Sequence, residues 1–204
     1  MAFNVKINFR RVWQVSFSMA VLVFIIGIAI DHTDVRRYAS RMESLMAQGD
    51  YQGALAVGER SDKTDQRLLN LRIEALAHEH QLGERLFSYP VKGSGRHLIA
   101  RKGDYELCGY LIDKQLDSFT AALPHYYNIG EQRLPRYYRE ALVLYNHLRS
   151  NPHIVYHNNV LDTDYRDMRE LARQYSDPKA RQMAVFNSYE DTYWYYFDYL
   201  NKQK

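Results

Sequence analysis

The 204-residue sequence contains one cysteine, five prolines and ten glycines. A single cysteine, Cys108, excludes an intrachain disulfide and the CxxC patterns of metal and redox sites. Scarce proline and glycine beside 18 tyrosines suit packed amphipathic helices better than a loop-rich fold. The chain is nevertheless long enough to bury a core without disulfide or metal staples.

Long blocks of one charge are also lacking. The 27 basic and 24 acidic residues are interspersed and leave a net charge of +3. Nucleic-acid binding normally requires a basic stripe, and none is visible, so no nucleic-acid partner is expected. Alternation of apolar and polar residues with a period of two is rare as well, and we therefore expect almost no β-strand.

One long apolar run is present near the N-terminus. Val12 to Ile30 is 19 residues without a charge, and it follows Lys6, Arg10 and Arg11. As a helix it is close to the roughly 30 Å of a bilayer's hydrocarbon core. A cleavable secretory signal is one alternative, although its apolar part is usually shorter, and a buried core helix is another. The pattern predicts a transmembrane helix.

This prediction divides the chain into three parts: a short basic tail at residues 1–11, a transmembrane anchor at residues 12–30 and an α-helical domain at residues 31–204. The expected location is thus the membrane, with a single span. Three basic residues precede the span and three follow it soon after, so the charge rule is nearly balanced. Asp31, Asp34 and Glu43 dilute the second basic group, and this difference favours an inside N-terminus with the helical domain outside the cytoplasm.

Helical hairpins are predicted after the apolar run. Apolar residues recur on one face of residues 34–48, a turn follows at Gly49 and Asp50, and a short helix covers residues 51–59. The same order of helix, tight turn and helix recurs twice. One copy has a helix at residues 68–78, a turn at residues 80–83 and a helix through Leu86 and Phe87 to Tyr89; the other pairs residues 104–112 with 117–123. Between these two pairs, Val91 to Lys102 has no apolar period and is expected to be a loop.

The C-terminal half has the clearest helix signals. A helix begins at Pro135, with one apolar face formed by Leu134, Tyr138, Ala141, Leu142, Tyr145 and Leu148. Asp162 or Thr163 is expected to cap the next helix. Asp177 followed by Pro178 is expected to open the last one.

The hairpins resemble tetratricopeptide repeats, which place an aromatic residue early in the first helix and an alanine in the second. Tyr38, Leu45 and Ala54 occupy such places in the first unit, and Tyr105 and Ala121 do so in the third. The second unit has Arg85 at the alanine position. The expected fold class is all-α, with an N-terminal transmembrane helix followed by degenerate TPR-like helical-hairpin repeats.

The order of segments resembles a particular family as well. The apolar run is followed by GDYQGAL, LGERLFSYP, LPRYYREALVLYNHL and finally EDTYWYYFDYL. Together these look like the C-terminal part of an uncharacterised family of bacterial polytopic membrane proteins, a domain of unknown function, in which the last span leads into a TPR-like region. The chain lacks the spans that come earlier in that pattern. The resemblance implies an architecture and supplies no activity.

No constellation of residues predicts catalysis. His78 and His80 are two apart and diverge on a helix, and His153 and His157 lie beside Pro152, where a helix is disfavoured. Cys108 is expected to be a buried structural thiol. We therefore predict no catalytic residue, no metal site and no cofactor.

The terminal stretch DTYWYYFDYL is rich in aromatic rings. A single helix through it places most rings on one face, formed by Tyr189, Tyr193, Tyr196, Phe197 and Leu200. Trp194, Tyr195 and Tyr199 fall outside that face. Three interpretations are open: a terminal core helix, a partner surface built from these three residues, or a box for a small ligand.

The function expected from sequence is a membrane-anchored helical-repeat scaffold that binds a protein partner and has no catalysis of its own. One alternative is a membrane-bound enzyme or small-ligand binder with dispersed site residues. Another is a subunit of a membrane protein complex, held by its span.

Overall fold

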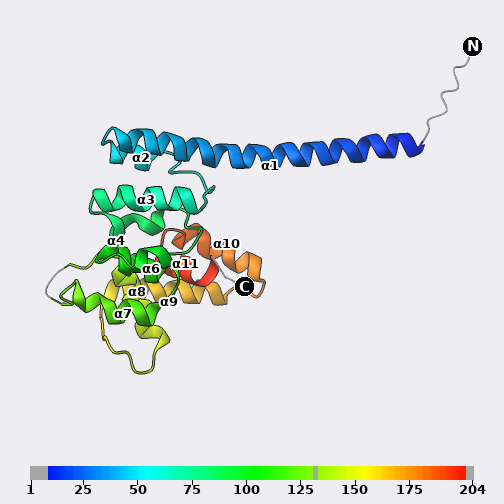
Figure 1. Cartoon of the computed structure of the whole chain (residues 1–204). Coiled ribbons are helices and arrows are strands. Elements are labelled where there is room, and N and C mark those ends of the chain that lie inside the picture. The colour runs from blue at the N-terminus through cyan, green and yellow to red at the C-terminus, as the bar shows by residue number, and fades with distance from the viewer. Residues whose placement is uncertain (1–8, 131–132, 201–204) are drawn as a thin grey trace, which may run out of the picture.

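The structure is a computed structural model that describes residues 9–130 and 133–200 (Figure 1). Within these residues the regular elements are all helices, and no β-strand occurs, so the expected all-α class is confirmed. The helices are α1 (Phe9–Ala47), α2 (Tyr51–Ala56), α3 (Gln66–His78), α4 (Leu82–Arg85), η1 (Leu86–Ser88), α5 (Arg96–Ile99), α6 (Asp104–Ile112), α7 (Leu116–Ala122), η2 (Leu123–His125), α8 (Arg136–Leu148), α9 (Asn159–Arg173), α10 (Pro178–Tyr189) and α11 (Tyr193–Tyr199).

The C-terminal part of α1 and the short helix α2 form the first hairpin. Gly49 makes the turn at φ +80°, a conformation that glycine adopts without a steric penalty. Asp50 then caps α2, because its side chain accepts a 2.8 Å hydrogen bond from the backbone N–H of Gly53. Buried Met42 and Ala54 join the two helices to α3. The first predicted hairpin is therefore confirmed.

The predicted transmembrane helix at residues 12–30 is not supported by the structure. No helix among the described residues is long and apolar enough to cross a membrane. A span needs about 20 consecutive apolar residues, and the described side chains of α1 include the polar Ser16 and Ser18 among its apolar ones. Of the predicted span, the side chains of residues 12, 14, 15 and 22–30 lie outside the described part of the chain, as do residues 1–8 of the predicted basic tail.

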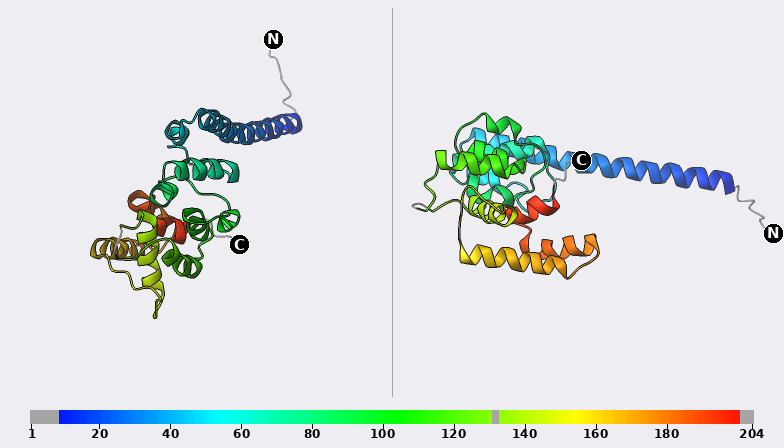
Figure 2. Two further views of the ribbon diagram at one scale, coloured as in Figure 1. Left: turned by 60° about the vertical axis from the view of Figure 1, so that its left-hand side comes forward. Right: turned by 90° about the horizontal axis from the view of Figure 1, so that it is seen from below.

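The remaining hairpins continue the stack away from α1, and α8 lies at its centre (Figures 1 and 2). Helix α3 packs on α1 and α2, and α4 connects α3 to α6 and α8. On its other sides α8 contacts α7, α9 and α11. Residues of α8 from Tyr137 to Tyr145 are therefore buried, except for the half-buried Arg139. The antiparallel pair of α9 and α10 forms the outermost layer.

Three local predictions differ from the structure. Residues 91–102, expected to be a loop, include the short helix α5, which packs on α6 where Gly95 meets Gly109 too closely for a side chain. Asn158 caps α9 in place of Asp162 or Thr163, because its side chain accepts a hydrogen bond from the N–H of Leu161. The terminal aromatic stretch is not one helix: α10 ends at Tyr189 and α11 begins after a turn.

Candidate functional site

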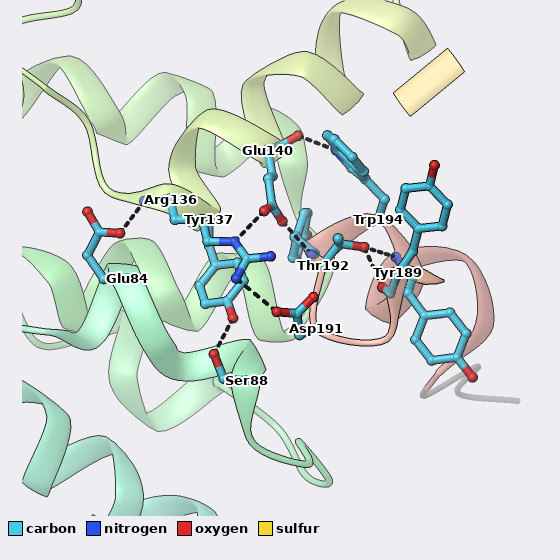
Figure 3. Close-up of polar contacts among 11 residues, drawn as sticks. Glu84, Ser88, Arg136, Tyr137, Glu140, Tyr189, Asp191, Thr192 and Trp194 are labelled. Carbon is cyan, nitrogen blue, oxygen red and sulfur yellow. Dashed lines mark hydrogen bonds and ion pairs between the residues drawn. The ribbon is translucent and has the colours of Figure 1, made fainter. Parts of the chain in front are cut away.

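A buried acidic residue on α8 is the centre of the candidate site. Glu140 is 2% exposed, and buried carboxylates of this kind are rare unless they are paired. Its Oε1 accepts a 2.8 Å hydrogen bond from Nε of Arg136, one helical turn earlier. Its Oε2 accepts a 2.7 Å hydrogen bond from the backbone N–H of Tyr193. Figure 3 shows that the carboxylate thus joins α8 to the start of α11.

Arg136 extends this network to two further segments. Its Nη1 donates to Oδ2 of Asp191 at 3.0 Å, in the turn between α10 and α11. Its backbone N–H donates to Oε2 of Glu84 on α4 at 3.1 Å. Nearby, the hydroxyls of Tyr137 and Ser88 lie 2.8 Å apart and tie α8 to η1 (Figure 3). Three segments far apart in the sequence therefore meet here: α4 with η1, α8, and the turn that leads into α11.

Burial dominates the electrostatics of Glu140 but not those of Arg136. Loss of water raises the pKa of Glu140 to about 7, against the opposing charge of Arg136 and the hydrogen bond from Tyr193. Burial works to lower the pKa of Arg136, but its hydrogen bond to Asp191 and the charge of Glu140 raise that pKa overall.

The first turn of α11 is held by two side chains. Thr192 caps the helix, because its Oγ1 accepts a 3.1 Å hydrogen bond from the N–H of Tyr195. Glu140 accepts a hydrogen bond from the N–H of Tyr193, the first residue of α11. The indole Nε1 of Trp194 donates to the backbone carbonyl of Glu140 at 2.8 Å. Two of the orphan donors of this short helix are thus satisfied, one by its own cap Thr192 and one by Glu140 of α8.

Helices α6 and α11 also complete each other's C-terminal ends. The hydroxyl of Tyr193 donates to the carbonyl of Leu111 at 3.1 Å, and that of Tyr196 donates to the carbonyl of Ile112 at 2.7 Å. In the other direction, Lys114 Nζ donates to the carbonyl of Phe197 at 2.8 Å and to that of Leu200. A cation at the end of a helix is also favoured by the helix dipole.

The chemistry available at Glu140 is restricted by its surroundings. A carboxyl with a pKa near 7 is a candidate for proton transfer in an open site. Both oxygens of Glu140, however, accept hydrogen bonds from groups of the chain itself, and the side chain is shielded from water. The arrangement therefore fits a clamp that holds α11 on α8.

The three residues predicted to bind a partner lie in or at the edge of the core. Trp194 and Tyr195 are 1% and 3% exposed, and Tyr199 is half-buried. The projection of the stretch on one continuous helix left these rings outside the buried face. Because α11 is a separate helix with neighbours on both α8 and α10, four consecutive rings from Tyr193 to Tyr196 are buried.

Other residues considered as site candidates from the sequence make packing contacts within the fold. The ring of His78 stacks on Tyr51 at a centroid distance of 3.8 Å. Cys108 is buried, its Sγ lies 3.5 Å from the hydroxyl of Tyr138, and burial raises the pKa of its thiol well above the ordinary range. Within the described part of the chain, no group of three or more His, Cys, Asp and Glu side chains is placed to hold a metal ion.

Two exposed apolar residues on α10 were not singled out from the sequence. Met183 is 61% exposed and Phe186 is 41% exposed, and the spacing of three puts both on one helix face. The ring of Phe186 contacts Tyr195 with centroids 5.8 Å apart, and Tyr195 stacks on Tyr199. We call Met183 and Phe186 of α10, together with the neighbouring Tyr199 of α11, the α10 patch. The signal in the sequence was the spacing of three between two large apolar residues, Met183 and Phe186, in the run KARQMAVFNS.

The fold and this site define an all-helical protein whose C-terminal aromatic helix is locked into a stack of hairpins. Comparison with protein families matches residues 97–200, just over half of the chain, to a family of unknown function (DUF6057). The chain belongs to this family, and the matched region runs from α5 to the end of α11. A domain of unknown function was expected from the order of segments. No curated protein matches the chain. No solved structure matches it either.

Proposed function

We propose that the chain is a TPR-like helical-repeat scaffold that binds another protein and has no catalysis of its own. Stacked helical hairpins offer extended surfaces to partners, which is the common use of such architectures. The bacterial origin and the membrane setting implied by the family resemblance stay predictions.

The observation that carries the proposal is the exposure of the α10 patch. Met183 and Phe186 are exposed on the outermost helical pair, although the chain buries four of the six rings of its terminal aromatic stretch. Exposed apolar residues that lie together are typical of interaction sites, whereas single ones are common on any surface. Phe186 and Tyr199 both contact the ring of Tyr195, so these two residues of the patch share one support.

The predicted partner residues acquire a supporting role in this proposal. Tyr195 lies beneath the patch, where its hydroxyl accepts a 3.4 Å hydrogen bond from Gln182 of α10. Trp194 fixes α11 on α8 through its indole nitrogen. A rigid base reduces the conformational entropy that a partner must remove on binding. Tyr199 is the one of the three that retains exposed surface for direct contact.

The test is crosslinking of the full-length protein in its native cells, followed by mild extraction and mass spectrometry of the proteins that co-purify. Wild type is compared with a Met183→Ser/Phe186→Ser variant. We expect one dominant partner in the wild type and at least about a tenfold loss in the variant, because removing two central apolar contacts costs more than 1.4 kcal/mol.

The matched control is Val155→Ser, which removes an exposed apolar residue from the loop before α9. This variant is expected to retain the partner. Equal retention by the α10 variant would contradict the position of the surface, and the absence of any partner besides the chain itself would contradict the scaffold function.

A further inference from the structure

Arg72 on α3 is a fully buried cation without a counter-charge. It is 0% exposed and is one of the largest fully buried side chains of the protein. A buried charge is costly unless an opposite charge and a full set of hydrogen bonds compensate for it. The groups around this guanidinium therefore determine how far its charge is compensated.

All partners of Arg72 are neutral and distant. Its Nη2 donates to the carbonyl of Gly58 at 3.3 Å, and its Nη1 lies 3.5 Å from both the hydroxyl of Thr64 and the carbonyl of Pro90. Its buried Nε has no hydrogen-bond partner. No carboxylate in the described part of the chain forms an ion pair with it, and the ring of Tyr89 covers it at 5.1 Å. Burial lowers the pKa of Arg72, which reflects this incomplete compensation.

A cleft lies on the far side of Thr64, one of the hydrogen-bond partners of this cation. It has a volume of about 440 Å³ and is formed where α1 meets the segment that leads into α3. Its polar lining consists of Arg36, Lys63, Thr64, Lys92, Asp62 and Asp65. Thr64 belongs to both places, because it lines the cleft and its hydroxyl oxygen lies toward Arg72.

The charges of the cleft are not equivalent. Asp65 is committed to α3, since it accepts from the N–H of Leu68 at 2.8 Å, and Lys63 pairs with Asp34 at 3.0 Å. Arg36 and Lys92 are exposed, and neither forms an ion pair with a described carboxylate. With the oxygen of Thr64 facing Arg72, its O–H proton is available to donate into the cleft. Two basic groups and one hydroxyl donor therefore line the cleft, together with the exposed carboxylate of Asp62, which an anion must avoid.

We propose that this cleft binds the phosphate group of a small anionic molecule, held by Arg36, Lys92 and the hydroxyl of Thr64, with Arg72 as a buried positive charge behind it. Phosphate fits this set because it accepts several hydrogen bonds and matches guanidinium groups well. The bound anion supplies the negative charge that Arg72 lacks in the protein itself. The excess of basic groups also opposes binding of a cation at this position.

The test is thermal unfolding of the full chain in sodium phosphate and in sodium chloride of equal ionic strength. At a phosphate concentration ten times its dissociation constant, the unfolding midpoint is expected to rise by about 3 °C over the chloride sample. The rise is expected to disappear in an Arg36→Gln/Lys92→Gln variant, whose changes are confined to exposed side chains. Lys102→Gln removes an exposed charge outside the cleft lining and is expected to keep the full rise.

Arg72→Met tests the buried cation separately. Replacing an incompletely paired buried charge by an apolar side chain of similar length is often tolerated, so the variant is expected to fold and to lose the phosphate response. If it fails to fold, the double variant still decides the matter. No phosphate-specific rise in the wild type, or an undiminished rise in the double variant, would overturn the proposal.

Discussion

The carboxylate of Glu140 accepts a 2.7 Å hydrogen bond from the backbone N–H of Tyr193, 53 residues later in the chain. This contact puts a side chain of the central helix at the start of the terminal aromatic helix. It explains why a seven-residue helix, too short to be stable alone, is ordered on the core. Four expectations depend on this junction and on its surroundings.

The first concerns pH. The pKa of Glu140 is raised in the folded state to about 7, from an ordinary value near 4.5. The folded protein therefore holds this proton more tightly, and its stabilising contribution is complete below about pH 4.5 and is lost as the pH rises through about 7. The difference in unfolding free energy between wild type and Glu140→Gln is expected to fall by about 3 kcal/mol over this window.

This difference is measured by denaturant unfolding at several pH values. Glutamine keeps an oxygen that can accept from the N–H of Tyr193, and it does not titrate. The titration of the other acidic groups is common to both proteins and cancels in the difference. A difference that is constant from pH 4.5 to 7.5 would contradict the upward shift.

The second expectation concerns the cap of α11. Thr192→Ala removes the hydroxyl that accepts from the N–H of Tyr195 and is expected to lower the unfolding free energy by about 1 kcal/mol. Thr163→Ala is the matched control, because that exposed hydroxyl bonds only within α9, to the carbonyl of Asn159 and to Arg166. Denaturant unfolding that gave equal effects for both variants would contradict the capping role.

The third expectation concerns the hydroxyls that complete α6. Tyr193→Phe and Tyr196→Phe each leave a buried backbone carbonyl with one partner fewer, and each is expected to cost about 1 kcal/mol. Tyr195→Phe is the control in the same helix, since its hydroxyl makes only a 3.4 Å contact with Gln182. A larger effect from Tyr195 than from the other two would be inconsistent with this assignment, as measured by chemical denaturation.

The fourth expectation concerns Cys108. Burial raises the pKa of its thiol, so the reactive thiolate is scarce and the sulfur is out of reach of reagents. In the folded protein, alkylation by iodoacetamide is expected to be at least about a thousandfold slower than in the denatured chain, because it requires opening of the core. Rapid alkylation under native conditions would show that the thiol is accessible.

Local signals predicted much of the helical order. Asp177 with Pro178 marked the start of α10, and the described helix begins at that proline with Asp177 as its cap. The prediction for α6 matched its bounds, Asp104–Ile112. Such boundaries depend on residues within one turn of each other, which a sequence displays directly.

The candidate site could not be predicted in the same way. The contacts of Glu140 with Tyr193 and of Arg136 with Asp191 join residues more than 50 apart, and no periodicity encodes them. The burial of Trp194 depended on the break of the helix after Tyr189, where Thr192 begins a new one. Because α11 runs in its own direction, the rings that the sequence pattern had assigned to a partner surface lie against α8 and α10.

The N-terminal prediction was wrong for another reason. It relied on apolar composition over one window, whereas the described part of the chain contains no helix that meets the length and apolarity of a span. The buried cation Arg72 was missed because its helix position reads as a polar residue between Leu71 and Ile73. Its burial depends on contacts distant in the sequence, with Gly58 in the turn after α2 and with Pro90.

The central claim is that the terminal aromatic helix is a buried clamp and that the partner surface lies outside it, on α10. Amide hydrogen exchange of the full chain, alone and with the partner recovered by crosslinking, tests both parts at once. We predict slow exchange for residues 195–200 in both states and new protection in residues 180–189 when the partner is bound. Fast exchange of residues 195–200 in the free protein, or protection gained there and not on α10, would contradict the account.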